Sequence, residues 1–402
     1  MLTSVVSPEA RLLLAAGRED DAGTDAIRAL LAGPVNWERL LWLATYEKAS
    51  PLLLRGVQRA GEAAVPAEQL AQLRKLAMVV EFRMLHVRQR LNETADVLAA
   101  AGIDGVLLKG AALGCTVYPS VVDRPMSDID LLVPLERAHE AREILARAGW
   151  RWNAEAGQDE QYAGHHHLPP LVDARGGTLR LELHTELFIM GHPFPLSGKV
   201  VRRDARTVAV GAREFRVPST LHQLLHACLH FAWSHALRVA SWRAFRDVRA
   251  LTVRGGVPWD EFVVAARENR AATCCYWTLR LARDLMGVQV PAETLAALRP
   301  PLPEFVLRRL AQHFAVQLFA RELACPSVAL EKMMWEMGVM PRWSGHGASR
   351  PWNEADALAE GKPAVRPVPS GSSRAMRQLR NLERWSRYAR AVLAPAATNA
   401  GK

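Results

Sequence analysis

The stretch that decides the fold is KGAALGCTVYPSVVDRPMSDIDLLVP, which spans residues 109–134. An apolar run, 106–108, comes directly before it. If 128–133 is a β-strand, side chains alternate between its two faces, so Asp128 and Asp130 point the same way. Two carboxylates two residues apart on a strand, beside a glycine turn, suit a divalent metal ion bound to a polyphosphate.

The composition is that of an ordinary globular protein. The chain has 402 residues, of which 50% are hydrophobic and 23% are charged, which suffices for two or three domains with a sizeable core. Its five cysteines are odd in number and contain no Cys-x-x-Cys pair, so we expect reduced, mostly buried thiols in a cytoplasmic protein. Residues 1–19 lack the pattern of a signal peptide, and no apolar stretch reaches membrane-spanning length.

The net charge of +10 is concentrated at the C-terminal end. Residues 342–402 contain eleven Lys/Arg and four Asp/Glu, so the rest of the chain is only mildly basic. Within this end, 373–393 has the pattern of a basic amphipathic helix. Such a helix suits RNA or a membrane surface, but we favour docking on the body of the protein through the Trp385 face.

Five regions follow from the pattern of apolar residues and turns. Residues 1–100 are predicted to be helical and to pack against the domain that follows. Residues 101–217 form an α/β unit with a small mixed sheet, and 218–344 form a second helical region. A Gly/Pro/Ser/Ala-rich linker at 345–372 leads to the tail helix in 373–402. The fold class is therefore α+β or α/β, with a small sheet flanked by helical regions.

The α/β unit alternates short strands and helices. It is predicted to begin with a strand at 104–109, a helix at 110–117, a strand at 128–133 and a helix at 135–148. Strands at 165–172 and 178–184 and a hairpin at 206–217 follow.

A third acid tests the metal-site interpretation. On a strand at 178–184, Glu182 shares a face with Arg180 and His184. If this strand lies beside 128–133, Glu182 sits next to the aspartates, and three carboxylates can hold two Mg²⁺ ions. The alternative is that Glu182 is a solvated residue paired with Arg180.

Three segments together resemble a known family. They are Lys-Gly-Ala at 109–111, Arg-Pro-Met-Ser-Asp-Ile-Asp-Leu-Leu-Val at 124–133, and Leu-Glu-Leu-His at 181–184. In this order they are similar to a family of uncharacterised nucleotidyltransferases within the DNA polymerase β-like superfamily. The resemblance covers about 100–190 and continues more loosely to about 300.

The resemblance implies transfer of a nucleoside monophosphate from an NTP, with ATP among the candidates, to a hydroxyl acceptor. Pyrophosphate is released, and the acceptor is a small molecule, a protein or RNA. By matching position, Asp128 and Asp130 would bind two Mg²⁺ ions, for which Mn²⁺ is a substitute. Glu182 would be the third ligand, and Gly110 would let the backbone approach the triphosphate.

The chain departs from the superfamily at the phosphate turn, where Ala111 stands in place of the usual serine. Lys109 and Arg124 are placed to supply positive charge instead, and His184 is expected to line the pocket. Two other interpretations stay open: Lys109 as an exposed strand-end residue, and Arg124 as a partner of Asp123 or of an active-site aspartate.

Other histidines and one aspartate invite functional interpretations. We favour a structural or substrate-lining role for 165–167 over a zinc site, because only alternate residues of a strand share a face. His222, His226 and His230 recur on one helix face without a metal-site glutamate, and we interpret them as packing or acceptor-side residues. Asp247 is expected to pair with an arginine across the helices.

Two other functions remain open from the sequence. One is a catalytically degenerate nucleotidyltransferase fold that serves as a binding or regulatory module, with RNA as a partner of the basic tail. The other is a metal phosphohydrolase, which would share the acids but would not need the Lys-Gly turn. The missing serine favours the degenerate module slightly, and the three acids argue against it.

Overall fold

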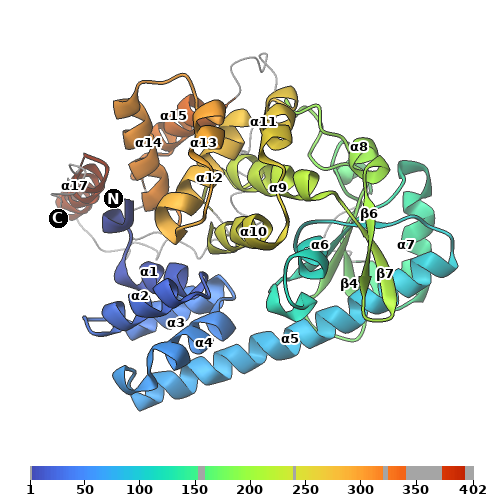
Figure 1. The fold of residues 1–402 in the computed structure, drawn as a ribbon, viewed down its shortest axis with the longest axis horizontal. Coiled ribbons are helices and arrows are strands. Elements are labelled where there is room, and N and C mark those ends of the chain that lie inside the picture. The colour runs from blue at the N-terminus through green and yellow to red at the C-terminus, as the bar shows by residue number, and fades with distance from the viewer. Residues whose placement is uncertain (1, 153–158, 239–240, 320–324, 341–373, 394–402) are drawn as a thin grey trace.

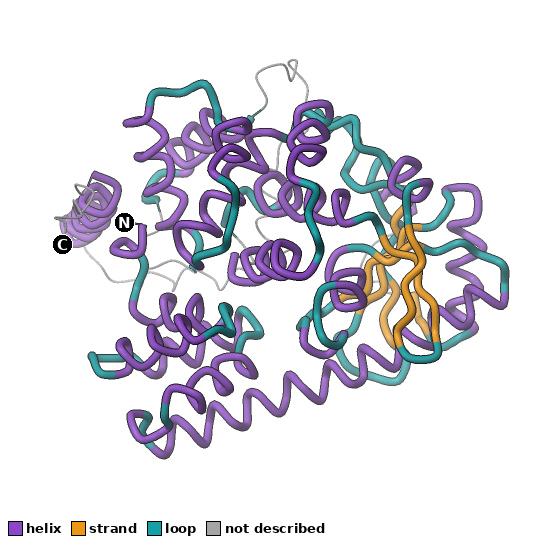
Figure 2. The backbone as a smooth tube through the Cα atoms, in the orientation of Figure 1, coloured by secondary structure: helices purple, strands orange, loops and turns teal. Residues whose placement is uncertain are grey.

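The computed structural model describes residues 2–152, 159–238, 241–319, 325–340 and 374–393 (Figure 1). Helices surround one seven-stranded mixed sheet (Figure 2), which confirms the predicted fold class. The predicted linker lies outside the described residues, and the domain boundaries stay predictions. Among the described residues, no helix has the length and apolar character that crossing a membrane requires. The five cysteines are unpaired and four are buried.

The sheet has the strand order β3-β4-β5-β2-β1-β7-β6. The β2–β5 and β1–β7 pairs are parallel and the other pairs are antiparallel. The strands are β1 Val106–Leu107, β2 Asp128–Leu132, β3 Trp150–Trp152, β4 Leu171–Asp173, β5 Arg180–His184, β6 Arg206–Val210 and β7 Arg213–Val217.

The two faces of the sheet differ in chemistry. Ile129 and Leu131 of β2 and Leu181 of β5 point to an apolar face, which packs on the 34-residue helix α5, Ala67–Ala100, and on α7, Ala138–Arg147. The opposite face carries the polar residues of the same strands, as strand alternation requires. Helix α6, Lys109–Thr116, follows β1 and contributes Ala111 and Ala112 to the apolar core, and α8, Gly198–Arg203, follows β5.

A large helical region follows the sheet. Ser219 caps its first helix, since the Ser219 side chain accepts a hydrogen bond from the His222 amide. The sequence did not reveal α15. The elements are α9 Thr220–Leu229, the π-helix η7 His230–Ser234, α10 Ser241–Arg254, α11 Trp259–Glu268, α12 Ala272–Met286, α13 Ala292–Leu298, α14 Glu304–Gln317 and α15 Val328–Val339.

The four helices before α5 pack mainly on the helical region that follows the sheet. They are α1 Pro8–Ala16, α2 Asp21–Leu31, α3 Trp37–Tyr46 and α4 Ser50–Ala60. They share one hydrophobic core with the helices after the sheet, and Trp242 of α10 donates its indole N–H to the Leu13 carbonyl over 2.7 Å. The prediction that the N-terminal helices pack against the following domain is therefore confirmed for α5, whereas α1 to α4 close on the helices after the sheet (Figure 1).

The predicted strand at 165–172 was wrong over most of its length. Only Leu171–Asp173 forms β4, and before it His167 makes a single isolated bridge to His184. Pro169 and Pro170 explain the difference, because proline has no amide hydrogen to donate to a sheet. The segment 165–170 is consequently irregular.

The tail helix α17, Arg374–Leu393, docks on the body as predicted, but through a different face. Tyr388 and Val392 are buried in a small cluster with Val316 of α14, whereas Trp385 is 37% exposed. The Tyr388 hydroxyl also lies 2.6 Å from Nδ1 of His313.

Candidate active site

The three predicted acids, Asp128, Asp130 and Glu182, lie together on the polar face of the sheet. In the parallel β2–β5 pair, Asp130 is opposite Glu182, and Asp128 is opposite Arg180. Ligand atoms of Asp130, Glu182 and His184 all lie within 4.8 Å of one another. Parallel pairing in this register places the acids side by side, while the apolar residues between them enter the core.

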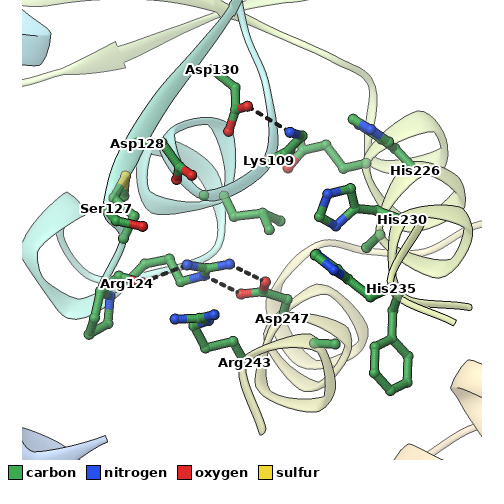
Figure 3. Close-up of a pocket in the computed structure, with 18 of the residues that line it drawn as sticks. Lys109, Arg124, Ser127, Asp128, Asp130, His226, His230, His235, Arg243 and Asp247 are labelled. Carbon is green, nitrogen blue, oxygen red and sulfur yellow. Dashed lines mark hydrogen bonds and ion pairs between the residues drawn. The ribbon is translucent and has the colours of Figure 1, made fainter. Parts of the chain in front are cut away.

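Asp130 is buried and fully compensated. Its Oδ1 accepts a hydrogen bond from Lys109 Nζ over 2.7 Å and lies 2.9 Å from His184 Nε2 (Figure 3). Burial favours the neutral acid, but the Lys109 ammonium and the His184 ring hold the pKa of Asp130 well below its usual range. Burial and the Lys109 charge lower the pKa of His184, but its hydrogen bonds to Asp130 and Glu182 raise it above the ordinary value. Lys109 is thus a half-buried ion-pair partner and not a free strand end.

Asp128 lacks such compensation. Its carboxylate makes no hydrogen bond or ion pair within the part of the chain that the structure describes. Burial, followed by the nearby charges of Asp130 and Glu182, raises the pKa of Asp128. Glu182 instead has its carboxylate 3.5 Å from His184 Nε2, so the alternative pairing with Arg180 was wrong. A cation beside Asp128 would relieve the repulsion among the three acids.

The Lys109–Gly110 turn begins helix α6 next to these acids. Lys109 has a φ of 45°, and no side chain caps the amides of the first turn. A Cβ on Gly110 would lie 3.2 Å from Nη1 of Arg124, so glycine permits this close approach. Ala111 is only 1% exposed and packs in the core below the sheet. The start of α6 therefore offers uncapped backbone amides, which favour anions.

Arg124 pairs with Asp247 of α10. Its Nε and Nη2 donate to the two carboxylate oxygens over 2.7 Å each (Figure 3). The Tyr118 hydroxyl also donates to Oδ1 over 2.7 Å. The prediction that Asp247 pairs with an arginine across the helices is confirmed, whereas pairing of Arg124 with Asp123 or an active-site aspartate was wrong. The bidentate pair fixes the guanidinium beside the start of α6.

Sequence reasoning missed two further cations at this place. Lys48 and Arg243 line the same cavity as Arg124, and their side chains make no hydrogen bond or ion pair with other described residues. Lys48 follows helix α3 with a φ of 56°, a backbone conformation that costs energy in a non-glycine residue. Burial and then the charge of Arg243 lower the pKa of Lys48 to about 8. No motif in the sequence marks either residue.

The acids and cations enclose one cavity of about 410 Å³ between the sheet and the helices. We call Asp128, Asp130 and Glu182 its carboxylate wall, and Lys48, Arg124 and Arg243 its cation wall. Figure 3 shows His226, His230 and His235 on the side opposite Asp128 and Asp130. His184 lies behind the carboxylates and is fully buried, so its predicted lining role is replaced by contacts with Asp130.

The histidine side of the cavity is buried and locally strained. Burial lowers the pKa of His226 to about 3 and that of His230 well below its usual value. Nε2 of His226 is buried without a hydrogen-bond partner among described residues. The π-helix η7 leads into Ala236 and Leu237, whose φ angles are 48° and 59°. Irregular helices and strained residues of this kind concentrate at functional sites.

The site combines acids on a mixed sheet, a helix start that is free to bind an anion, and an opposing cation wall. This combination is that of a nucleotide-handling α/β protein. The chain belongs to a family described as uncharacterised nucleotidyltransferases, whose profile matches residues 33–287. Every cavity-lining residue, from Lys48 to Asp247, falls within this match. Family membership supports a general nucleotidyltransferase role and a nucleotide substrate. Comparisons with curated proteins and with solved structures found no significant match.

Proposed function

We propose that this protein transfers a nucleoside monophosphate from an NTP to a hydroxyl acceptor and releases pyrophosphate. The observation that carries the proposal is the meeting of the carboxylate wall and the cation wall in one cavity, at the start of helix α6. Divalent metal ions suit the acids, and polyphosphate suits the cations. The unpaired cysteines and the need for NTP support action in the cytoplasm.

The carboxylate wall has the donors that Mg²⁺ or Mn²⁺ prefers. Asp128 faces two like charges and has no ion-pair partner among the described residues, while Asp130 and Glu182 supply further oxygen donors nearby. We therefore assign two metal ions to Asp128, Asp130 and Glu182. Bound there, the ions would activate the attacking hydroxyl and neutralise the departing pyrophosphate. The ammonium of Lys109 already occupies one oxygen of Asp130 and is free to contact phosphate once a metal compensates that acid.

The cation wall is assigned to the polyphosphate. The like charges of Lys48 and Arg243 repel, and neither side chain makes an ion pair with another described residue, although the charge of Asp128 acts on Lys48. Anion binding stabilises such an arrangement. Arg124 lies between them and the start of α6. A bound polyphosphate would therefore extend from the metal centre along the α6 amides to these cations. The lost serine hydroxyl at Ala111 is thereby offset by charge.

The remaining side of the cavity is assigned to the acceptor. The described acids that line the whole cavity are the carboxylate wall, which is assigned to the metal ions, and Asp247. Asp247 is already paired with Arg124. No carboxylate of the described lining is left for an ammonium group, so we propose an acceptor that is neutral or anionic near its hydroxyl. The unpartnered Nε2 of His226 is available to hydrogen-bond it.

NTP binding tests the assignment without knowledge of the acceptor. Titration calorimetry would compare the intact protein with Asp128→Ala/Asp130→Ala and with the control Asp96→Ala/Glu140→Ala, which removes two exposed acids elsewhere. We expect Mg²⁺-dependent NTP binding in the intact protein and the control, and none in the active-site variant. Equal Mg²⁺-dependent affinity in all three proteins would refute the metal assignment.

A further inference from the structure

Three consecutive histidines gather at the back of the active site. His165, His166 and His167 follow the short 3₁₀ helix η6, Asp159–Tyr162, and none of them lines the cavity. One ligand nitrogen from each ring lies within 4.8 Å of the others. A regular strand would have pointed His166 away from its neighbours. Because the prolines at 169 and 170 prevent regular pairing, all three rings reach the same place.

The rings are held by contacts that leave nitrogen lone pairs available. Nδ1 of His167 donates to the Leu168 carbonyl over 2.7 Å, so its Nε2 is unprotonated in the neutral ring. Metal-binding histidines commonly fix their other nitrogen to a backbone carbonyl in this way. Nδ1 of His166 is buried and has no hydrogen-bond partner among described residues, which is costly unless a ligand satisfies it. The Tyr162 ring packs against His165 and His167 at 4.8 and 5.5 Å.

We propose that His165, His166 and His167 bind a divalent transition-metal ion of the Zn²⁺ class, at a site separate from the carboxylate wall. Imidazole nitrogens select Zn²⁺, Co²⁺, Ni²⁺ or Cu²⁺, whereas Mg²⁺ requires oxygen donors. Zn–N bonds of about 2.0–2.1 Å bring ligand nitrogens closer together than 4.8 Å, so the rings rotate inward on binding. His165 is exposed and gives the ion access from solvent.

The site lies one imidazole away from the catalytic acids. The rings of His166 and His167 are centred 5.0 and 5.3 Å from that of His184, and His184 contacts Asp130. An ion held there would fix the packing behind His184 and thereby the orientation of Asp130. The protein would then use two chemically different metal sites, one with oxygen donors and one with nitrogen donors.

Metal titration of the full-length protein in excess Mg²⁺ tests this assignment. Zn²⁺ is followed by calorimetry, and Co²⁺ by its visible absorption, which reports nitrogen ligands and coordination number. We expect one tightly bound ion per chain, with affinity weakened at least about 100-fold in His165→Ala/His167→Ala. His166→Gln should act similarly, while His139→Ala, which removes an exposed histidine of α7, should have no effect. Circular dichroism of each variant verifies folding.

The Asp128→Ala/Asp130→Ala variant separates this site from the active site. We expect it to keep full Zn²⁺ and Co²⁺ binding while losing Mg²⁺-dependent NTP binding. Loss of Zn²⁺ binding in this variant would place the ion at the carboxylates and overturn the proposal. Equal Zn²⁺ affinity in the histidine variants, or the weak binding shown by any exposed histidine run, would overturn it as well.

Discussion

The two walls of the cavity are built in opposite ways. The carboxylate wall comes from two neighbouring strands, and its residues lie within 55 positions of one another in the chain. The cation wall joins Lys48 of the N-terminal helices, Arg124 of a loop and Arg243 of α10. One wall follows from strand alternation alone, whereas the other exists only after the two ends of the chain have packed together.

Both walls nevertheless share one electrostatic property. Burial and then the charges of Asp130 and Glu182 raise the pKa of Asp128, and burial and then the charge of Arg243 lower the pKa of Lys48. The attraction between Asp128 and Lys48 opposes both shifts without cancelling them. Each wall therefore holds charge that weakens the folded protein and that a bound metal–polyphosphate would compensate. Residues kept at a cost to stability are expected at functional sites. Substitutions that neutralise either wall should consequently remove function and increase stability.

The largest effect is expected for Asp128→Asn. The uncharged amide is a poor metal ligand, and loss of several kcal/mol of transition-state stabilisation lowers nucleotidyl transfer about 10³-fold or more. Because burial and like charges raise the pKa of Asp128, its ionised form weakens the fold at pH 7, and the variant should melt at a higher temperature. Transfer rates and thermal melts measure the two effects. A variant that is active, or inactive because it is unfolded, would contradict the account.

The next effect concerns the cation wall. Each charge-assisted hydrogen bond contributes about 1.5–3 kcal/mol, so Lys48→Met/Arg243→Met should weaken NTP binding about 100-fold or more. NMP binding should be unchanged, because an NMP lacks the phosphates assigned to this wall.

Calorimetric titrations with NTP and NMP measure that difference, with Lys75→Met/Arg88→Met, which removes two exposed positive charges of α5, as the charge-matched control. Equal losses of affinity for NTP and NMP would show that the two cations do not contact the β- and γ-phosphates. Since burial lowers the pKa of Lys48 to about 8, its charge is unfavourable in the folded state. Lys48→Met alone should therefore melt no lower than the intact protein.

A pH-dependent change in stability is expected at Glu47, the residue before Lys48 of the cation wall. Glu47 is buried, and burial raises its pKa from 4.5 to about 7. The protonated Glu47 carboxyl contributes to the free energy of unfolding. This contribution is fully present below about pH 4.5 and is lost as pH rises through about 7. Glu47→Gln stays neutral, so its free energy of unfolding should exceed that of the intact protein by about 3 kcal/mol at pH 8 and by little at pH 4.5. Urea unfolding at the two pH values measures this, and a pH-independent difference would contradict it.

The smallest effect is expected at the phosphate turn. Ala111 is buried in the apolar core, so Ala111→Ser would bury a hydroxyl and lower stability by about 1–2 kcal/mol. NTP affinity should stay within about twofold of the intact protein, a change below 0.5 kcal/mol by the usual conversion. A large gain in NTP affinity would instead show that the turn lacks a phosphate contact that charge does not replace.

The predictable part of the site is its local part. The period-two pattern of Asp128-Ile129-Asp130 and of Arg180-Leu181-Glu182 fixed which side chains share a face, and the confirmed β2–β5 pairing brought them together. The strand predicted at 165–172 was wrong because the effect of Pro169-Pro170 on pairing was overlooked. That error also hid the convergence of the three histidines, which a strand does not permit.

The unpredictable part depends on distant packing. Arg124 and Asp247 are 123 positions apart, and nothing local indicates which acid meets which arginine. Lys48 enters the cavity because the N-terminal helices share a core with α10 and α12, a contact that amphipathic patterns do not specify. Helical periodicity shows that a face is buried but does not identify its partner.

Transfer of label from the two ends of an NTP tests the central claim most directly. The protein, Mg²⁺ and cell extract are incubated with NTP labelled at either the α- or the γ-phosphate, and the labelled products are compared with those of Asp128→Ala/Asp130→Ala. We predict that the intact protein attaches the α-label to an acceptor and releases the γ-label as pyrophosphate, and that the variant does neither. Attachment of the γ-label, or undiminished transfer of the α-label by the variant, would contradict the account.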